Sequence, residues 1–244
     1  MASTSHRAAA VARLVDLALP GQVRIGVTTS GPVSWLPSGV AALDALLGGG
    51  VPRGRISEVI GPPSSGRTSL LLALLATATR RGEVVAWVDL TDALHPESCM
   101  RAGVDLHRLL WVRPRQTADG LRCAEILLRA GGFALVALDC GAVPPGAWRM
   151  RVWPRLLQAA EQSHTALVVL APQWIVGSPA ALGLRLGTQR TFWLPGVWPL
   201  FEGFDTVANL ERNKLGNVAR ARVRVRMASA IQLVPSTRHE HESP

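Results

Sequence analysis

The sequence predicts an α/β domain in which a mainly parallel central sheet is flanked by helices and continued by an antiparallel C-terminal extension. Strand-length apolar runs occur at residues 56–60, 84–88, 109–112, 134–138 and 166–170. Segments of helical period separate most of these runs, which is the order of β-α-β units with parallel strands. After Gly187 the pattern changes to strand-like pieces at residues 191–194, 205–212 and 217–227, joined by short turns. These pieces predict the antiparallel extension.

The composition is that of a folded globular protein. Of the 244 residues, 48% are hydrophobic and 18% are charged, which excludes a disordered chain, collagen and a coiled coil. The longest apolar run, at residues 69–79, is shorter than the roughly 18 residues that a membrane span requires, so no membrane segment is predicted. Arg7, Arg13 and Asp16 interrupt the apolar positions of the N-terminus, so no secretory signal is predicted and a cytoplasmic protein is expected.

Two helices are predicted ahead of the first strand. Residues 8–19 place Val11, Leu14, Val15 and Leu19 at helical spacing, which predicts an amphipathic helix that docks on another surface. Residues 40–47 form the second helix, capped by Ser38 and ended by three glycines. We therefore expect an N-terminal helix and lead-in at residues 1–34, a core domain at residues 35–234 and a disordered polar tail at residues 235–244.

The cysteines indicate no disulfide framework or zinc site, whereas the charge balance favours a class of partners. Cys99, Cys123 and Cys140 lack the spacing of a disulfide framework or a zinc site, so we expect three buried thiols. The 26 basic and 17 acidic residues give a net charge of +9, which favours nucleic acid or acidic proteins as partners. Only one of the basic residues is a lysine, Lys214, a bias that a GC-rich coding sequence would also produce.

A phosphate-binding loop is predicted between the apolar run at residues 56–60 and a leucine-rich helix. Residues 61–68 match G-x-x-x-x-G-K-[ST] at every position except the lysine. The glycines let backbone N–H groups and the helix N-terminus face an anion, and the Thr68 hydroxyl is a candidate Mg²⁺ ligand. Asp139, after the run at 134–138, is the second candidate ligand. The alternative is a glycine turn that binds nothing.

The residue in place of the loop lysine is Arg67. A lysine acts there as a compact charge between the β- and γ-phosphates, and a planar, bulkier guanidinium is not a conservative replacement. We therefore expect ATP and Mg²⁺ to bind weakly, if they bind, and hydrolysis to suffer.

Several segments resemble the RecA family, specifically its shortened ImuA branch. Residues 54–68 look like the RecA strand and Walker A loop, and residues 88–96 followed by 102–105 look like the next strand and helix. Leu138 and Asp139 resemble Walker B, and residues 171–173 resemble the strand end whose glutamine, here Gln173, senses the γ-phosphate. Arg212 and Lys214 resemble a basic pair that reaches the nucleotide of a neighbouring subunit. The similarity runs from about residue 35 to residue 227 and implies a RecA-like P-loop fold.

Together, motif and resemblance give one set of candidate nucleotide-binding residues. They are Gly61, Pro62, Pro63, Ser64, Ser65, Gly66, Arg67, Thr68, Ser69, Asp139 and Gln173.

Three departures from the family pattern argue against a working recombinase. Thr91 occupies the position of the water-activating glutamate and cannot act as a carboxylate base, and Asp92 beside it is expected to point elsewhere. Arg67 replaces the phosphate lysine. The stretches that match the two DNA-binding loops, residues 140–148 and 173–187, are short, and the large C-terminal domain of RecA has no counterpart in this sequence.

Tryptophan and arginine gather where a recombinase would hold DNA. Five of the eight tryptophans are Trp148, Trp153, Trp174, Trp193 and Trp198. Around the first two, Arg149, Arg151 and Arg155 interleave with the aromatic residues. This pattern suits base stacking with phosphate contact, a protein contact, or ordinary packing of a helix on the sheet with solvated arginines.

A second basic pattern is an arginine ladder near the C-terminus. Arg220, Arg222, Arg224 and Arg226 alternate with small apolar residues, so a strand would place all four on one face. The ladder either protects an edge strand from aggregation or receives an acidic partner or a phosphate backbone.

The resemblance implies a non-recombinogenic accessory protein of DNA-damage tolerance, in SOS mutagenesis and translesion synthesis. Its partners would be RecA and an ImuB-like Y-family adaptor of an error-prone C-family polymerase complex, with non-specific DNA contact left open. Two alternatives remain: a DNA-dependent ATPase and recombinase paralogue, and a cell-division inhibitor similar to SulA.

Overall fold

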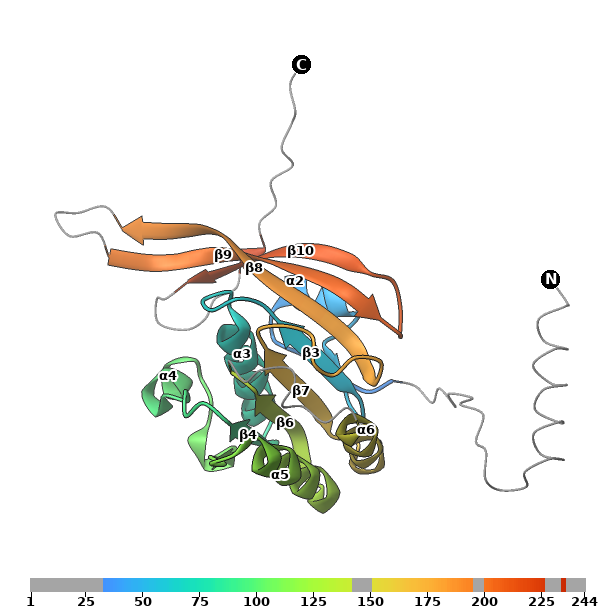
Figure 1. Cartoon of the computed structure of the whole chain (residues 1–244). Helices are drawn as coiled ribbons and strands as arrows, with labels where there is room; N and C mark the ends of the chain where they lie inside the picture. The colour runs from blue at the N-terminus through green and yellow to red at the C-terminus, as the bar shows by residue number, and fades with distance from the viewer. Residues whose placement is uncertain (1–32, 142–150, 195–199, 227–233, 236–244) are drawn as a thin grey trace, which may run out of the picture. The chain divides into compact units, whose positions relative to one another are not determined.

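The computed structural model describes residues 33–141, 151–194, 200–226 and 234–235 (Figure 1). The predicted helix at residues 8–19, with Val11, Leu14 and Val15, lies outside the described residues, as do Trp148, Arg149 and Trp198. The compact unit that carries the described elements begins at Ser34.

A nine-stranded mixed sheet organises the described chain. Its strands, in spatial order, are β11 (Val234–Pro235), β10 (Ala219–Arg226), β9 (Leu200–Asn213), β8 (Ala180–Leu194), β3 (Ile56–Ile60), β7 (Ala166–Ala171), β6 (Phe133–Asp139), β4 (Val84–Asp89) and β5 (Leu109–Val112). All pairs from β8 to β5 are parallel, and those from β8 to β11 are antiparallel. The predicted fold class is therefore confirmed.

The predicted strands agree best with the structure in the parallel half. The five apolar runs are β3 to β7, with ends within one residue of those predicted. The extension differs, because β8 begins at Ala180 and β9 at Leu200, well before the pieces predicted at 191 and 205. The first part of β8 pairs with β3 on one edge and with the end of β9 on the other, so it connects the parallel half to the antiparallel extension.

Helices cover both faces of the sheet. Ahead of it, β1 (Trp35–Leu36) pairs with β2 (Val51–Pro52) around α2 (Ala41–Leu47). Alternate strand residues face two cores, so that Val85 and Trp87 join the core with α2 and α3 (Arg67–Arg80), whereas Ala86 and Val88 join the core with α5 (Thr117–Ala130) and α6 (Val152–Ser163). Figure 1 shows α5 and α6 next to each other. The remaining helices are α4 (Pro96–Arg101) and a 3₁₀ turn, η1 (Leu106–Arg108).

The start of α2 corrects the predicted cap. Val40, not Ser38, is the N-cap residue, and the helix ends as expected at Gly48, whose φ is +81°. Ser38 still organises this turn, because its Oγ accepts a hydrogen bond from the Val40 N–H at 3.1 Å and donates to Asp44 Oδ1 at 2.6 Å. The hydroxyl therefore acts two residues ahead of the N-cap position.

Two further expectations need correction. Cys99 and Cys140 are buried, but Cys123 is only half-buried, because it lies at the margin of the α5 face that packs on the sheet. Pro235, expected to begin a disordered tail, pairs with Val223 in β11 instead. Among the described helices, none combines the length and the apolar character needed to cross a bilayer.

A buried carboxylate joins β3 to the segment that follows β7 and to β9. The side chain of Glu58 is fully buried, and its Oε1 accepts hydrogen bonds from the backbone N–H groups of Ile175 and Val176. Arg212 Nη1 lies 3.6 Å from Glu58 Oε2 and donates to the Gly177 carbonyl at 2.7 Å. Burial raises the pKa of Glu58, although these N–H groups and Arg212 act in the opposite direction.

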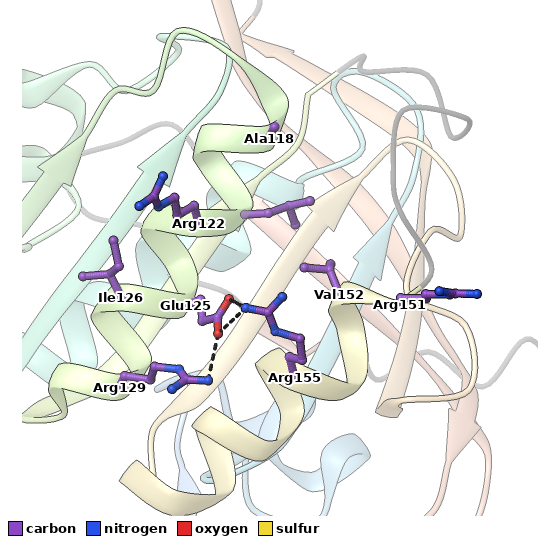
Figure 2. A pocket seen from close by; sticks show the side chains of 9 residues that line it. Ala118, Arg122, Glu125, Ile126, Arg129, Arg151, Val152 and Arg155 are labelled. Atoms are coloured by element: carbon purple, nitrogen blue, oxygen red, sulfur yellow. Dashed lines mark hydrogen bonds and ion pairs between the residues drawn. The ribbon is translucent and has the colours of Figure 1, made fainter.

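A second carboxylate joins α5 to α6 and has the opposite electrostatic character. Both oxygens of Glu125 accept hydrogen bonds from Arg155 Nη2, at 2.8 and 2.7 Å, and Arg129 Nη2 lies 3.0 Å from Oε1 (Figure 2). The hydrogen bond from Arg155 is the main reason that the pKa of Glu125 is lowered.

These opposite shifts predict opposite pH dependences of stability. A raised folded-state pKa means that Glu58 stabilises most below about 4.5, the ordinary value of glutamate, and that this contribution is lost as the pH rises through the folded-state pKa. We expect the free energy of unfolding of the wild type, relative to Glu58→Gln, to fall with rising pH, by about 1.4 kcal/mol per pH unit between the two pKa values. Urea denaturation at a series of pH values measures this difference.

Glu125→Gln is the matched control. Because the folded-state pKa of Glu125 is lowered, its contribution is present above the ordinary glutamate pKa and is lost as the pH falls. The advantage of the wild type over Glu125→Gln should therefore grow with pH. Equal pH slopes for the two variants would contradict the assignment for Glu58.

Candidate functional site

The predicted phosphate loop lies between β3 and α3, at the carboxyl ends of the parallel strands. Ser64 and Gly66 have positive φ angles, +60° and +97°, which turn the backbone sharply before the helix. Gly66 is the N-cap of α3 and provides no side-chain cap. The N–H groups of the first helical turn are therefore available to an anion.

At both glycines of the loop, neighbouring atoms lie so close to the backbone that a side chain would contact them. A Cβ at Gly61 would lie 2.5 Å from Ser65 Oγ and 2.6 Å from the Leu186 carbonyl oxygen, so any larger residue would open the loop. A Cβ at Gly66 would lie 3.3 Å from the ring of Phe204. The sequence motif thus corresponds to a closely packed loop at residues 61–68, here called the cradle, rather than to an open turn.

Two buried polar atoms of this cradle favour an anionic ligand. Within the described residues, Ser65 Oγ and Arg67 Nη1 are buried and have no hydrogen-bond partner. A buried polar group without a partner is unfavourable unless a ligand or water satisfies it. Together with the uncapped helix N-terminus, these atoms fit a phosphate group, and Mg²⁺ bound with the phosphates would neutralise part of their charge.

The strands β8 and β9 complete the site from a part of the chain far from the loop. Thr206 Oγ1 donates to the Ser65 carbonyl at 2.8 Å. Thr191, Trp193 and Phe204 line a cavity of about 400 Å³ together with residues 64–69. Thr191, Phe204 and Thr206 could not be predicted as site residues, because only a period-two spacing marks them in the sequence and nothing local connects them to the loop.

Two carboxylates lie side by side at the ends of β4 and β6. Asp89 and Asp139 are register partners of these neighbouring strands, and both are buried. Burial is the main reason that the pKa of Asp139 is raised, and the charge of Asp89 adds to this effect, whereas the Gly141 N–H and Arg67 oppose it. Asp89, which we did not predict as a site residue, accepts hydrogen bonds from the Leu94 N–H at 2.9 Å and from Trp111 Nε1 at 3.3 Å.

Thr91 lies at the same edge as Asp139. Its N–H and its hydroxyl both donate to Asp89 Oδ1, at 3.1 and 3.2 Å. A Cβ at Gly141 would overlap Thr91 Cγ2, and the Gly141 N–H donates to Asp139 Oδ1 at 3.0 Å. Thr91 is therefore next to the Asp139 turn, whereas Asp92 points to Arg113, whose Nη1 is 3.4 Å from its carboxylate.

The predicted contacts from outside the loop, other than Asp139, are not brought to it. The side chain of Gln173 is exposed and has no hydrogen bond with another described residue. Arg212 is held by Gly177 and Glu58, as described above, and Lys214 Nζ donates to the Ser178 carbonyl.

Within the loop region, three of the predicted residues are exposed. They are Thr68 at the start of α3, and Pro62 and Pro63 in the loop. The structure shows no metal-binding group of three or more His, Cys, Asp or Glu among the residues it describes.

The described residues include part of the tryptophan and arginine pattern around α6 and part of the arginine ladder. Trp153, on α6, is 1% exposed in the core between this helix and the sheet, so of the three alternatives helix-on-sheet packing explains it, and it is not available for base stacking or a partner. Arg151 is exposed. Strand β10 covers all four positions of the arginine ladder, and among them the side chain of Arg220 is described and exposed.

The comparisons with known proteins agree with this geometry. Protein RecA of Clavibacter michiganensis is 43% identical over 118 residues, covering 48% of this chain and 33% of the relative. Protein RecA of Streptomyces coelicolor is 42% identical over the same length, covering 48% and 32%. The chain thus spans about a third of the length of the curated relatives it matches.

A solved structure extends the similarity beyond the loop region. The crystal structure of the RadB recombinase superimposes with a TM-score of 0.62 at 25% identity, covering 78% of this chain and 96% of that one. The family defined by the RecA N-terminal domain matches residues 20–147, which include the phosphate loop, Thr91 and Asp139. The chain therefore belongs to the RecA N-terminal domain family.

Proposed function

We propose that this chain is a RecA-family accessory protein of DNA-damage tolerance that holds a nucleotide without turning it over. This is the role of the ImuA branch that the sequence resembles. In it, the protein binds RecA and an ImuB-like Y-family adaptor of an error-prone C-family polymerase complex, in SOS mutagenesis and translesion synthesis.

The observation that carries this proposal is the contrast between the cradle and the groups around it. Backbone N–H groups at the start of α3, Ser65 Oγ and Arg67 Nη1 favour phosphate binding. The residue beside the Asp139 turn is Thr91, which has no carboxylate to activate water. Binding and turnover depend on different groups, and among the described residues next to the Asp139 turn the position that the resemblance gives to the water-activating carboxylate holds Thr91.

The proposed absence of recombination has support from the connection after β7. Residues 172–179 join β7 to β8 directly, and Ile175 and Val176 are buried and hydrogen-bonded to Glu58. This segment therefore lacks the length and the freedom to form a long DNA-binding loop. Contact with DNA, if it contributes, would be electrostatic and would come from the arginine ladder of β10.

Restoring two family residues should create ATP turnover. We expect the wild type to hydrolyse ATP negligibly, with or without single-stranded DNA, and Arg67→Lys combined with Thr91→Glu to raise the rate by about a hundredfold, because a positioned general base contributes 10²–10⁴-fold. Phosphate release from purified protein with ATP and Mg²⁺ measures both rates. Arg67→Lys with Thr91→Gln is the control, since it has the same bulk at position 91 without the carboxylate. A wild-type rate similar to that of an active recombinase would instead favour the ATPase and recombinase alternative.

The predicted N-terminal helix provides a test of the partner. Each aliphatic side chain of its stripe contributes about 1.5–3 kcal/mol when fully buried, so Leu14→Glu should abolish binding of the full chain to RecA in a pull-down. Ala9→Glu places the same charge on the opposite face of the predicted helix and should leave binding intact. Thermal melts accompany both variants. If Leu14→Glu lowers the melting temperature and leaves RecA binding unaltered, the helix packs on its own core and the docking role is wrong.

A further inference from the structure

A groove between α5 and α6 lies apart from the phosphate loop, on the other face of the sheet. Its volume is about 1220 Å³, and both helices contribute to its walls (Figure 2). The two helices bury Leu128 and Leu156 in the core that they share with the sheet. The groove is therefore lined mainly by side chains of the two helices outside this core, with Leu121 of the core at its base.

The floor and one edge of this groove are apolar. Leu121 is buried at its base, Val152 is half-buried, and Ile126 is 57% exposed. Ile126 is one turn of helix from Arg122, so an exposed aliphatic side chain lies among charged neighbours. An apolar surface rimmed by polar residues is typical of a site where another protein packs.

The rim of the groove carries an excess of positive charge. Arg129 and Arg155 share the carboxylate of Glu125, which leaves three uncompensated charges on the four arginines around one glutamate. The side chains of Arg122 and Arg151 have no ion pair or hydrogen bond with another residue that the structure describes, and both residues are exposed (Figure 2). These two guanidinium groups are free to bind carboxylates from outside.

We propose that this groove binds an acidic amphipathic segment of a partner protein. The apolar side chains of the segment would pack on Ile126 and Val152, and its Asp or Glu residues would pair with Arg122 and Arg151. Arg-carboxylate pairs are geometrically specific and add to the affinity of an apolar contact. The site extends the proposed function to a docking surface that does not involve the nucleotide loop.

The chemistry of the groove favours a protein over a nucleic acid. A phosphate backbone is uniformly negative and gains nothing from an apolar floor. An amphipathic peptide uses both the floor and the rim, which is the usual arrangement of a protein interface.

The test uses the purified full chain and a phage-displayed library of random peptides of about 16 residues, which span roughly 24 Å as a helix. We expect enrichment of peptides that combine apolar residues with Asp or Glu. The affinity of an enriched peptide, measured by fluorescence anisotropy, should fall about tenfold or more in Arg122→Glu and also in Ile126→Ser. Both positions are exposed, so the fold should be retained, which circular dichroism checks.

Arg101→Glu is the matched control, because it makes the same charge change at an 82% exposed side chain on α4 and should alter the affinity less than twofold. Enriched peptides without acidic residues, no enrichment, or equal losses in Arg101→Glu and Arg122→Glu would each overturn the proposal. A single-stranded oligothymidylate provides the nucleic-acid arm. If it displaces the peptide and its own binding is lost in Arg122→Glu, the groove binds nucleic acid and the proposal is wrong.

Discussion

Strand β3 has to be buried on both faces and bonded on both edges, and the rest of the structure depends on this constraint. All five of its residues are buried, and it pairs with β7 on one side and β8 on the other. A carboxylate in such a strand must find its partners inside the protein. Glu58 finds them in the segment after β7 and in Arg212 of β9, so the strand that ends in the phosphate loop also fixes the two regions that flank it.

The parallel half of the fold could be predicted from the sequence because its strands are buried on both faces and therefore appear as continuous apolar runs. The extension could be predicted only in outline. The first part of β8 includes Gly183 and Arg185, which interrupt the apolar run, and this part is a strand because β3 and β9 pair with it on either side. Likewise, Ser38 has the residue type of a cap, yet the N-cap position is set by Asp44 reaching back to the turn.

The candidate site likewise contains residues that could be predicted from the sequence and residues that could not. The loop and Asp139 could be predicted because each lies in a motif or directly after a buried strand, where the fold places it without help from distant residues. Thr91 could be identified only through the resemblance to the RecA family. Phe204 and Thr206 could not, because they meet the loop only once β9 has folded back beside β8. Trp153 shows the limit of composition, since a tryptophan beside arginines has the same sequence pattern whether it stacks on a base or fills a core.

The phosphate loop and the groove proposed for docking are associated with opposite faces of the sheet. The phosphate loop leads into α3, whose side chains pack in one core, while the groove between α5 and α6 lies over the other. Because the Glu125 pair with Arg155 is formed by α5 and α6 alone, an occupant of the groove can bind without altering the hydrogen bonds around Glu58 or the loop. In the proposed function, the RecA-type core serves as a rigid support for docking and does not need a carboxylate at position 91. In such a core, a nucleotide that binds the folded state would stabilise the loop side through mass action, whether or not it is hydrolysed.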